Sequence, residues 1–197
     1  KMLREIESND IIKIPIIGKG DFEIAKMIEK LQNYDWIWQG KEYYNKNYNE
    51  SKQTYNCPFC GRETSDDFRK QLELYFNESY NDQINQLDTI ESKYKEITGE
   101  ILATLNNIND IANNKFLDEM KQKLKEKVSL LSSKIYVNRN ILSDKKKNPS
   151  NSYTLEAIIT EIEEVNNLLN SVNKRIKEYN LLIADKEREK ENLSAEI

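Results

Sequence analysis

The sequence predicts an all-α protein, a long antiparallel coiled-coil hairpin on a small N-terminal base. Of its 197 residues 32% are charged and 9% aromatic, and the mean hydropathy is −0.82, so the chain is too polar to bury one large globular core. Through the second half, apolar residues recur at alternating steps of three and four, the spacing of a coiled-coil seam. Pro149 lies in a polar segment between two such stretches, where a helix cannot continue.

Residues 1–56 are predicted to form this base, part helical and part irregular. Asp21 is a suitable N-cap for an amphipathic helix, and Gly40 is a suitable C-terminal stop. Trp36 and Trp38 are two residues apart and cannot share one helix face. We therefore expect at least one of them to pack against the cysteine segment or the base of the coiled coil.

Residues 57–64 hold the only two cysteines, within the pentapeptide CPFCG that begins at Cys57. Two thiolates three residues apart supply half of a tetrahedral zinc site, and the chain has no histidine to add to Cys57 and Cys60. The proline and glycine permit a tight turn whose backbone N–H groups point at the sulfurs. The metal interpretation is therefore a zinc ion shared between two chains of a homodimer, or completed by sequence outside this chain.

Two other interpretations of the cysteines remain open. A dithiol oxidoreductase has the same spacing, but it requires a strand before the motif and a helix that starts at the first cysteine. The surrounding sequence predicts neither. Alternatively, Cys57 and Cys60 are reduced thiols in a turn that packs beneath the tryptophans.

The remaining residues are predicted to form the coiled coil. Residues 65–147 are the outgoing helix, residues 148–153 the hairpin loop and residues 154–197 the returning helix. Lysines before Pro149 favour the end of the outgoing helix. The seam of the returning helix consists of Leu155, Ile158, Ile162, Val165, Leu169, Val172, Ile176, Tyr179 and Ile183.

The segment 106–114 is poor in good helix formers and is the predicted site of a bend or break. We favour a continuous helix, because Ile108 and Ala112 keep the seam spacing. However, the returning helix would be about 65 Å long and the outgoing one about 120 Å. The unequal arms leave a three-helix bundle, folded near Asn107, as the alternative.

Composition limits the functions. No apolar stretch reaches the roughly 18 to 20 residues that span a bilayer, so we expect no membrane partner and a cytoplasmic location, where two close cysteines stay reduced. A net charge of −4 that is spread fairly evenly gives no support for direct duplex binding. The three lysines at 145–147 are predicted to form a solvated helix end, in preference to a nucleic-acid contact. The phosphate-loop pattern G-x-x-x-x-G-K-[ST] is absent, so we predict no catalytic residue and no nucleotide site in this sequence.

The order of motifs resembles a known family. The segments WIWQG at 36–40, CPFCGR at 57–62 and YFNESY at 75–80, ahead of a coiled coil, resemble the SMC-like, ABC-type P-loop ATPases that include the RloC and PrrC anticodon nucleases. The resemblance implies that head segments outside this sequence hydrolyse ATP and that Cys57 and Cys60 form a zinc-hook pair. It also implies a role in nucleic-acid-linked defence, through tRNA cleavage or DNA restriction and maintenance. One departure is that hook ATPases of the DNA-repair type carry C-x-x-C at the hairpin apex, whereas here the turn is expected near Pro149.

We therefore expect a non-catalytic module that links an ATPase head to a partner or to dimerisation and meets nucleic acid only indirectly. A freestanding coiled-coil adaptor is the alternative. Because Lys1 is no initiator and the heptads run to Ile197, we expect an internal piece of a longer protein. The candidate site residues are Cys57 and Cys60 for metal, and Trp36, Trp38, Gly40 and Pro149 for structure.

Overall fold

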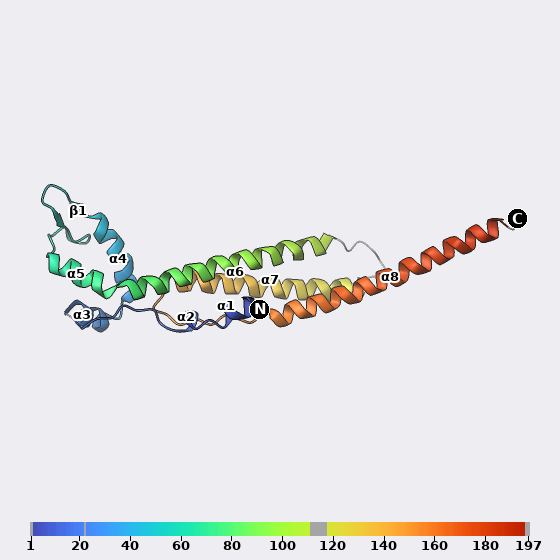
Figure 1. Ribbon diagram of the computed structural model, residues 1–197, viewed down its shortest axis with the longest axis horizontal. Coiled ribbons are helices and arrows are strands. Elements are labelled where there is room, and N and C mark those ends of the chain that lie inside the picture. Colours follow the sequence, from blue (N-terminus) through green and yellow to red (C-terminus); the bar gives the residue numbers. More distant parts are fainter. Residues whose placement is uncertain (1, 22, 111–117, 196–197) are drawn as a thin grey trace. The chain divides into compact units, whose positions relative to one another are not determined.

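The computed structural model describes residues 2–21, 23–110 and 118–195, and it is predominantly helical, which confirms the all-α prediction (Figure 1). Contacts divide the chain into two compact units, the first comprising Lys1–Glu96 with Asn138–Leu155 and the second Ile97–Val137 with Glu156–Ile197. The elements are α1 (Met2–Glu7), α2 (Asp10–Lys13), α3 (Glu23–Leu31), α4 (Tyr34–Lys46), β1 (Tyr48–Asn49), β2 (Thr54–Tyr55), α5 (Asp66–Tyr75), α6 (Glu78–Asp110), α7 (Asp118–Lys147) and α8 (Ile159–Ala195).

The N-terminal segment of the first unit is tied to the loop that follows α7. The N–H of Ile16 donates to the carbonyl of Pro149 at 2.9 Å, and the N–H of Tyr153 donates to the carbonyl of Ile12 at 3.0 Å. These two bonds hold the segments antiparallel. The side chains of Ile12 and Ile16 are buried, so this contact belongs to the core of the unit.

The helical base differs from its prediction at Gly40. Gln32 adopts a left-handed conformation with φ of 53° and ends α3 at Leu31, and α4 then runs through Gly40 to Lys46. Gly40 therefore lies inside a helix instead of ending one. The end of α3 at Gln32 was not predicted, because Gln, unlike Gly or Asn, is not a typical residue for a left-handed C-terminal position.

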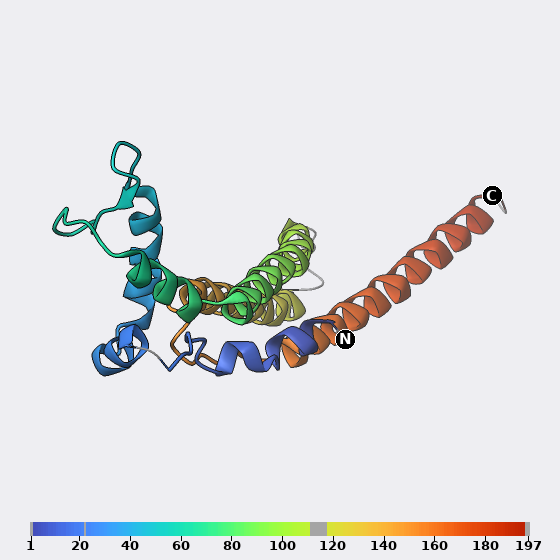
Figure 2. The same ribbon diagram turned by 60° about the vertical axis from the view of Figure 1, so that its left-hand side comes forward.

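A short hairpin and α5 complete the base (Figure 2). Strands β1 and β2 pair antiparallel with Tyr48 opposite Tyr55, and an isolated bridge joins Asn56 to Glu63. Helix α5 begins after Ser65, whose hydroxyl accepts a bond from the N–H of Phe68 at 3.1 Å. The cysteine segment lies between Asn56 and Glu63, so the bridge brackets it on both sides.

Within the first unit, α7 runs back along α6. Lys146 forms an ion pair with Asp88 at 2.8 Å, and Asn138 donates to the hydroxyl of Tyr94 at 2.8 Å. A single helix over 65–147 would separate Asp88 from Lys146 by about 87 Å. The chain therefore doubles back between α6 and α7, contrary to the continuous helix that we favoured, because long-range pairing of the two seams outweighs the local spacing.

The predicted break at 106–114 lies partly outside the described residues. Residues 106–110 belong to α6, and residues 111–114 are not described. A second interruption separates α5 from α6 at residues 76–77, inside the span predicted as one helix.

In the second unit α8 packs antiparallel to α7. Lys127 pairs with Glu164 at 2.6 Å, and Lys134 pairs with Glu161. Helix α8 begins at Ile159, five residues after the predicted start at Thr154. The seam residues Leu155, Ile158 and Val165 are buried.

The far part of α8 is largely exposed, including Tyr179, Leu181, Leu182 and Ile183. Among the described helices, none combines the length and the apolar character needed to cross a bilayer.

Candidate functional site at the cysteine knuckle

The CPFCG segment forms a closed turn, which we call the knuckle (residues 57–62). The N–H of Cys57 donates to the carbonyl of Arg62 at 2.8 Å, and the N–H of Gly61 donates to the carbonyl of Cys57 at 2.8 Å. Gly61 has φ of +69°, a conformation that side chains with a Cβ rarely adopt. The glycine is therefore what allows the turn to close.

The knuckle favours the thiolate of Cys57. The backbone N–H of Phe59 and then that of Cys60 donate to the Cys57 sulfur, and these bonds lower the pKa of the Cys57 thiol, with a smaller contribution from the Cys60 side chain. Cys57 is partly exposed and Cys60 is exposed. Because the thiolate is both the nucleophile and the metal ligand, this geometry suits metal binding.

The knuckle fits half of a structural zinc site. Its two thiols supply two of the four ligands that such a site needs, and backbone N–H groups that bond to the sulfur are typical of the surroundings of zinc thiolates. Over the described residues 2–21, 23–110 and 118–195, no group of three or more His, Cys, Asp and Glu side chains is placed to hold a metal ion. A zinc ion on Cys57 and Cys60 would thus require ligands from elsewhere.

The surroundings of Cys57 do not match those of a dithiol oxidoreductase. That chemistry uses a helix that begins at the first cysteine. Here the next helix, α5, begins only at Asp66, and the knuckle follows the two-residue strand β2. The cysteines therefore lie in a turn that a helix dipole does not reach.

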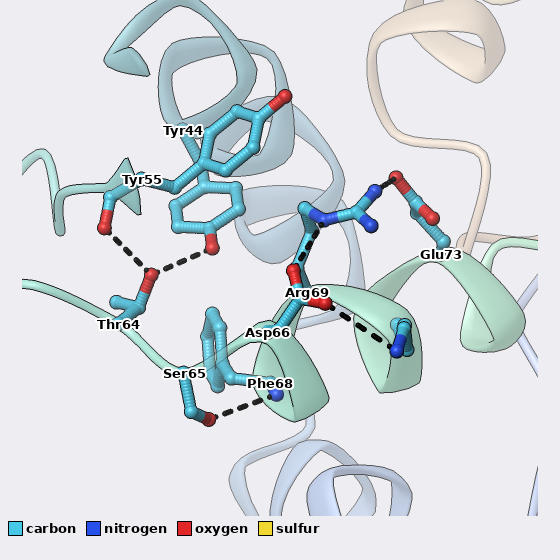
Figure 3. Close-up of polar contacts among 9 residues, drawn as sticks. Tyr44, Tyr55, Thr64, Ser65, Asp66, Phe68, Arg69 and Glu73 are labelled. Carbon is cyan, nitrogen blue, oxygen red and sulfur yellow. Dashed lines mark hydrogen bonds and ion pairs between the residues drawn. The ribbon is translucent and has the colours of Figure 1, made fainter. Parts of the chain in front are cut away.

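A cluster of aromatic and polar side chains from α4, β2 and α5 surrounds Thr64, which follows the knuckle (Figure 3). The Thr64 hydroxyl donates to the carbonyl of Tyr55 at 2.9 Å, so the hydroxyl of Tyr44, 2.7 Å away, donates to Thr64. The Tyr44 ring stacks on Tyr55 and meets Phe68 edge-on. Helix α4, strand β2 and helix α5 are thereby fixed to one another.

Arg69 adds a second tie in the same cluster. Its guanidinium pairs with Glu73 at 2.7 Å and with Asp66 at 3.4 Å, and it lies 5.8 Å from the centre of the Tyr55 ring. Both acidic partners belong to α5, as Figure 3 shows. The arginine therefore links α5 to the hairpin that leads into the knuckle.

The two tryptophans have different partners. Trp36 stacks on Phe59 of the knuckle, with ring centres 5.1 Å apart. Trp38 packs against Phe76 and Tyr80, where α5 passes into α6, at 5.4 and 5.0 Å. One tryptophan thus contacts the knuckle and the other the start of the first long helix.

The structure brings some of the predicted site residues together and separates others. Trp36, Gly40 and Cys57 line one apolar groove. Cys60 is exposed beside it on the knuckle. Trp38 packs elsewhere, and Pro149 lies in the loop after α7, where its carbonyl accepts bonds from Ile16 and Lys145.

Sequence reasoning missed Lys145, which is fully buried. Its ammonium donates to the carbonyl oxygens of Ile14, Pro149 and Asn151 at 2.6, 2.8 and 2.6 Å. A signal was available, because Lys145 continues the three- and four-residue spacing of Ile135, Asn138 and Leu142, which are buried on α7. The charge of the three lysines at 145–147 predicts a helix end in solvent, which is wrong for Lys145.

Comparison with known proteins gives a family. A sequence profile of the AAA_13 family, described as an AAA domain, matches residues 1–197. No curated protein and no solved structure matches the chain. The chain therefore belongs to the AAA_13 family of P-loop ATPase-like, SMC-like proteins.

Proposed function

We propose that this chain is a non-catalytic coiled-coil module of an SMC-like P-loop ATPase that acts in nucleic-acid-linked defence. In this proposal it links the ATPase head to a partner or to a second copy of the protein in the cytoplasm. It meets nucleic acid only through that assembly. The finer likeness to the RloC and PrrC anticodon nucleases, carried by the segments 36–40, 57–62 and 75–80, belongs to the proposal as well.

The observation that carries the proposal is the combination of family and architecture. The AAA_13 profile matches the whole chain, yet the sequence contains no G-x-x-x-x-G-K-[ST] phosphate loop and its longest elements are α6, α7 and α8. Long paired helices transmit motion between sites better than they enclose a substrate. We therefore assign ATP hydrolysis to segments outside this sequence.

The test is to compare the full-length protein with this chain. We expect the full-length protein to bind and hydrolyse ATP, measured by phosphate release, and this chain alone to do neither. Hydrolysis by the isolated chain would contradict a non-catalytic role. A full-length protein without ATPase activity would instead support the freestanding adaptor.

We further propose that Cys57 and Cys60 bind zinc together with the same pair from a second copy. The support is the thiolate-favouring turn and the shortage of further ligands among the described residues. Zinc binding would then contribute to the free energy of association. Each copy supplies two thiolates, and the backbone N–H groups of the knuckle hold Cys57 in place.

Metal analysis and mass in solution test this second point together. We expect one zinc per two chains in a dimer that a chelator weakens, and no zinc in a Cys57→Ser/Cys60→Ser double variant. Tyr43→Ser is the matched surface control, because Tyr43 is exposed and has no part in the knuckle. Metal-free protein after purification under reducing conditions would exclude the shared site.

A further inference from the structure

Helices α3, α4 and α5 form one packed body with the hairpin and the knuckle, which we call the α3–α5 body (residues 23–75). Helix α3 packs on both α4 and α5. The N–H of Ile24 donates to the side chain of Gln71 at 3.2 Å, and the bond between Tyr44 and Thr64 ties α4 to the segment before α5. The body therefore has internal contacts that can hold it together when it moves.

The chain enters and leaves this body at one place. The N–H of Lys19 donates to the carbonyl of Tyr75 at 3.3 Å, so the incoming and outgoing segments lie side by side. Gly18 lies so close to Tyr75 that a Cβ could not be added without a shift. Helix α5 ends at Tyr75 and α6 begins at Glu78, and Phe76 between them has φ of −96° and ψ of 63°. Two adjacent chain crossings beside a helix break suit a hinge, in which a few residues absorb the change in backbone angles.

Aromatic packing attaches the body to α6 beside these crossings. The centre of the Trp38 ring lies 5.4 Å from that of Phe76 and 5.0 Å from that of Tyr80. Both partners are buried. The side-chain oxygen of Asn77 accepts the N–H of Tyr80 at 3.1 Å, which fixes the start of α6. The contact at the hinge is thus apolar and closely packed.

A second attachment joins the body to the loop after α7, and it is polar. Asp35, in the first turn of α4, accepts the N–H of Ser150 at 2.9 Å and the hydroxyl of Ser150 at 2.6 Å. The side-chain amide of Gln39 adds a longer bond, of 3.3 Å, to the carbonyl of Lys147. Asp35 and Ser150 are half-buried and Gln39 is exposed, so water can replace these bonds at a small net cost in free energy.

The loop that carries Ser150 is held in place without the body. The buried ammonium of Lys145 binds the carbonyl oxygens on both sides of Ser150, those of Pro149 and Asn151. The carbonyl of Pro149 also accepts the N–H of Ile16. Release of Asp35 would therefore leave the loop where it is and free only the body.

We propose that the α3–α5 body swings on the hinge at Gly18 and Phe76, and that the contact of Asp35 with Ser150 is a clasp that holds the body closed against the end of α7. The body carries the knuckle, so opening the clasp changes where Cys57 and Cys60 lie relative to α6 and α7. The inference uses only contacts within the first unit. It does not rest on the proposed ATPase or zinc roles, and each can fail without the other.

Distances between paired nitroxide labels on the full chain test the clasp, in a Cys57→Ser/Cys60→Ser background that removes the native thiols. One pair joins α3 to α7 through Lys30→Cys and Asn140→Cys, at two exposed positions. We expect one narrow distance distribution with Asp35 in place and a broader one, extended to longer distances, in Asp35→Ala. Asp82→Ala removes an exposed carboxylate from α6 and is the matched control, which should keep the narrow distribution.

A second label pair separates swinging from misfolding. Lys30→Cys and Lys70→Cys both lie on the body, on α3 and α5, so their distance should be the same with and without Asp35. A second pair that broadens as much as the first would overturn the hinge, because the body would not move as a unit. A first pair that stays narrow in Asp35→Ala would overturn the clasp.

Hydrogen exchange tests the clasp in the unmodified chain. The N–H of Ser150 is released whenever the clasp opens, whereas the N–H of Ile16 stays bonded to Pro149. After correction for intrinsic rates, we expect the N–H of Ser150 to exchange at least about tenfold faster than that of Ile16, through a local opening that urea barely accelerates. Equal exchange of the two groups, with the same dependence on urea, would show that Ser150 is released only by unfolding and would overturn the clasp.

Discussion

The ammonium of Lys145 lies 2.6 Å from the carbonyl oxygen of Ile14, although the two residues are 131 positions apart in the sequence. The same ammonium donates to Pro149 and Asn151, and it is fully buried. Three carbonyl dipoles thus replace the water that a lysine would otherwise keep. Lys145 joins the N-terminal segment, the end of α7 and the loop after it into one structure.

Replacing Lys145 with methionine should destabilise the first unit. The variant keeps much of the side-chain volume but leaves three carbonyl oxygens without this donor. The carbonyl of Pro149 retains its bond from Ile16. We expect a loss of about 1–3 kcal/mol, the usual cost of a buried polar group left unsatisfied. Urea unfolding followed by tryptophan fluorescence measures it.

The control for that variant is Lys147→Met. Lys147 is at the same helix end, is largely exposed and pairs only loosely with Asp144, at 3.8 Å. Its loss should change stability by no more than a few tenths of a kcal/mol. Equal effects at both positions would show that the helix-end charge, not the buried bonds of Lys145, matters.

The lowered pKa of Lys145 should also make the free energy of unfolding depend on pH. Burial lowers the pKa of Lys145 to about 8, and Asp35 partly offsets this effect. The pKa of a lysine in the unfolded chain is about 10.4. Between these values the unfolded chain binds more protons, so the free energy of unfolding should rise with pH. Lys145→Met should reduce this rise and leave the part due to Lys41 and Cys57, whose pKa values are also lowered in the folded chain.

Above about pH 10 the trend should reverse. Burial raises the pKa of Tyr75 and of Tyr94 to about 12, so the folded chain then binds more protons than the unfolded one. Stability should therefore fall as the pH increases further, in the wild type and in Lys145→Met alike. Unfolding curves at half-unit steps between pH 7 and 11 would resolve both limbs. A flat profile in the wild type would contradict both assignments.

The periodicity of the sequence predicts the buried seam residues at the start of α8, but neither the exposure of Tyr179 and Ile183 nor how the seams pair. Ile158 and Val165 are buried as their spacing indicates. The spacing does not predict that α7 runs back along α6, because the heptad pattern of a helix is the same whichever helix it packs against. Asn138 and Lys145 lie at seam positions and are buried, so the polar residues of a seam were the available signal.

The candidate site was predictable in its chemistry and not in its geometry. The CPFCG spacing predicts a turn with two thiols, and the backbone N–H groups of Phe59 and Cys60 lower the pKa of Cys57. The groove beside it is assembled from residues between Ile24 and Leu72 that no local pattern connects. Side chains so far apart in sequence meet only through tertiary packing.

Two glycines should respond to alanine in opposite directions. A Cβ at Gly18 would overlap the ring and the carbonyl oxygen of Tyr75, which is fully buried and has no room to move. Gly18→Ala should therefore cost about 1–3 kcal/mol, as overpacking does. A Cβ at Gly40 would meet nothing within 4 Å, and α4 is helical there.

Gly40→Ala should thus stabilise the base by about 0.5–1 kcal/mol, through the lower flexibility of the unfolded chain. Denaturation midpoints of the two variants, read from the fluorescence of Trp38 beside Phe76, give the comparison. Destabilisation by Gly40→Ala would mean that the groove it lines tolerates no added methyl group.

The thiol of Cys57 should ionise at a lower pH in the folded protein than in the unfolded chain. The N–H groups of Phe59 and Cys60 that lower the pKa of Cys57 are backbone groups, so they persist in a Cys60→Ser variant that isolates this thiol. Alkylation by iodoacetamide tracks the thiolate. The rate in metal-free Cys60→Ser should reach its half-maximum at a lower pH without urea than in strong urea.

Gly61→Ala should reduce the difference, because Gly61 has φ of +69° and an alanine there strains the turn that aims those N–H groups. If urea leaves the pH at half-maximal alkylation unchanged, the knuckle does not stabilise the Cys57 thiolate that a metal would need.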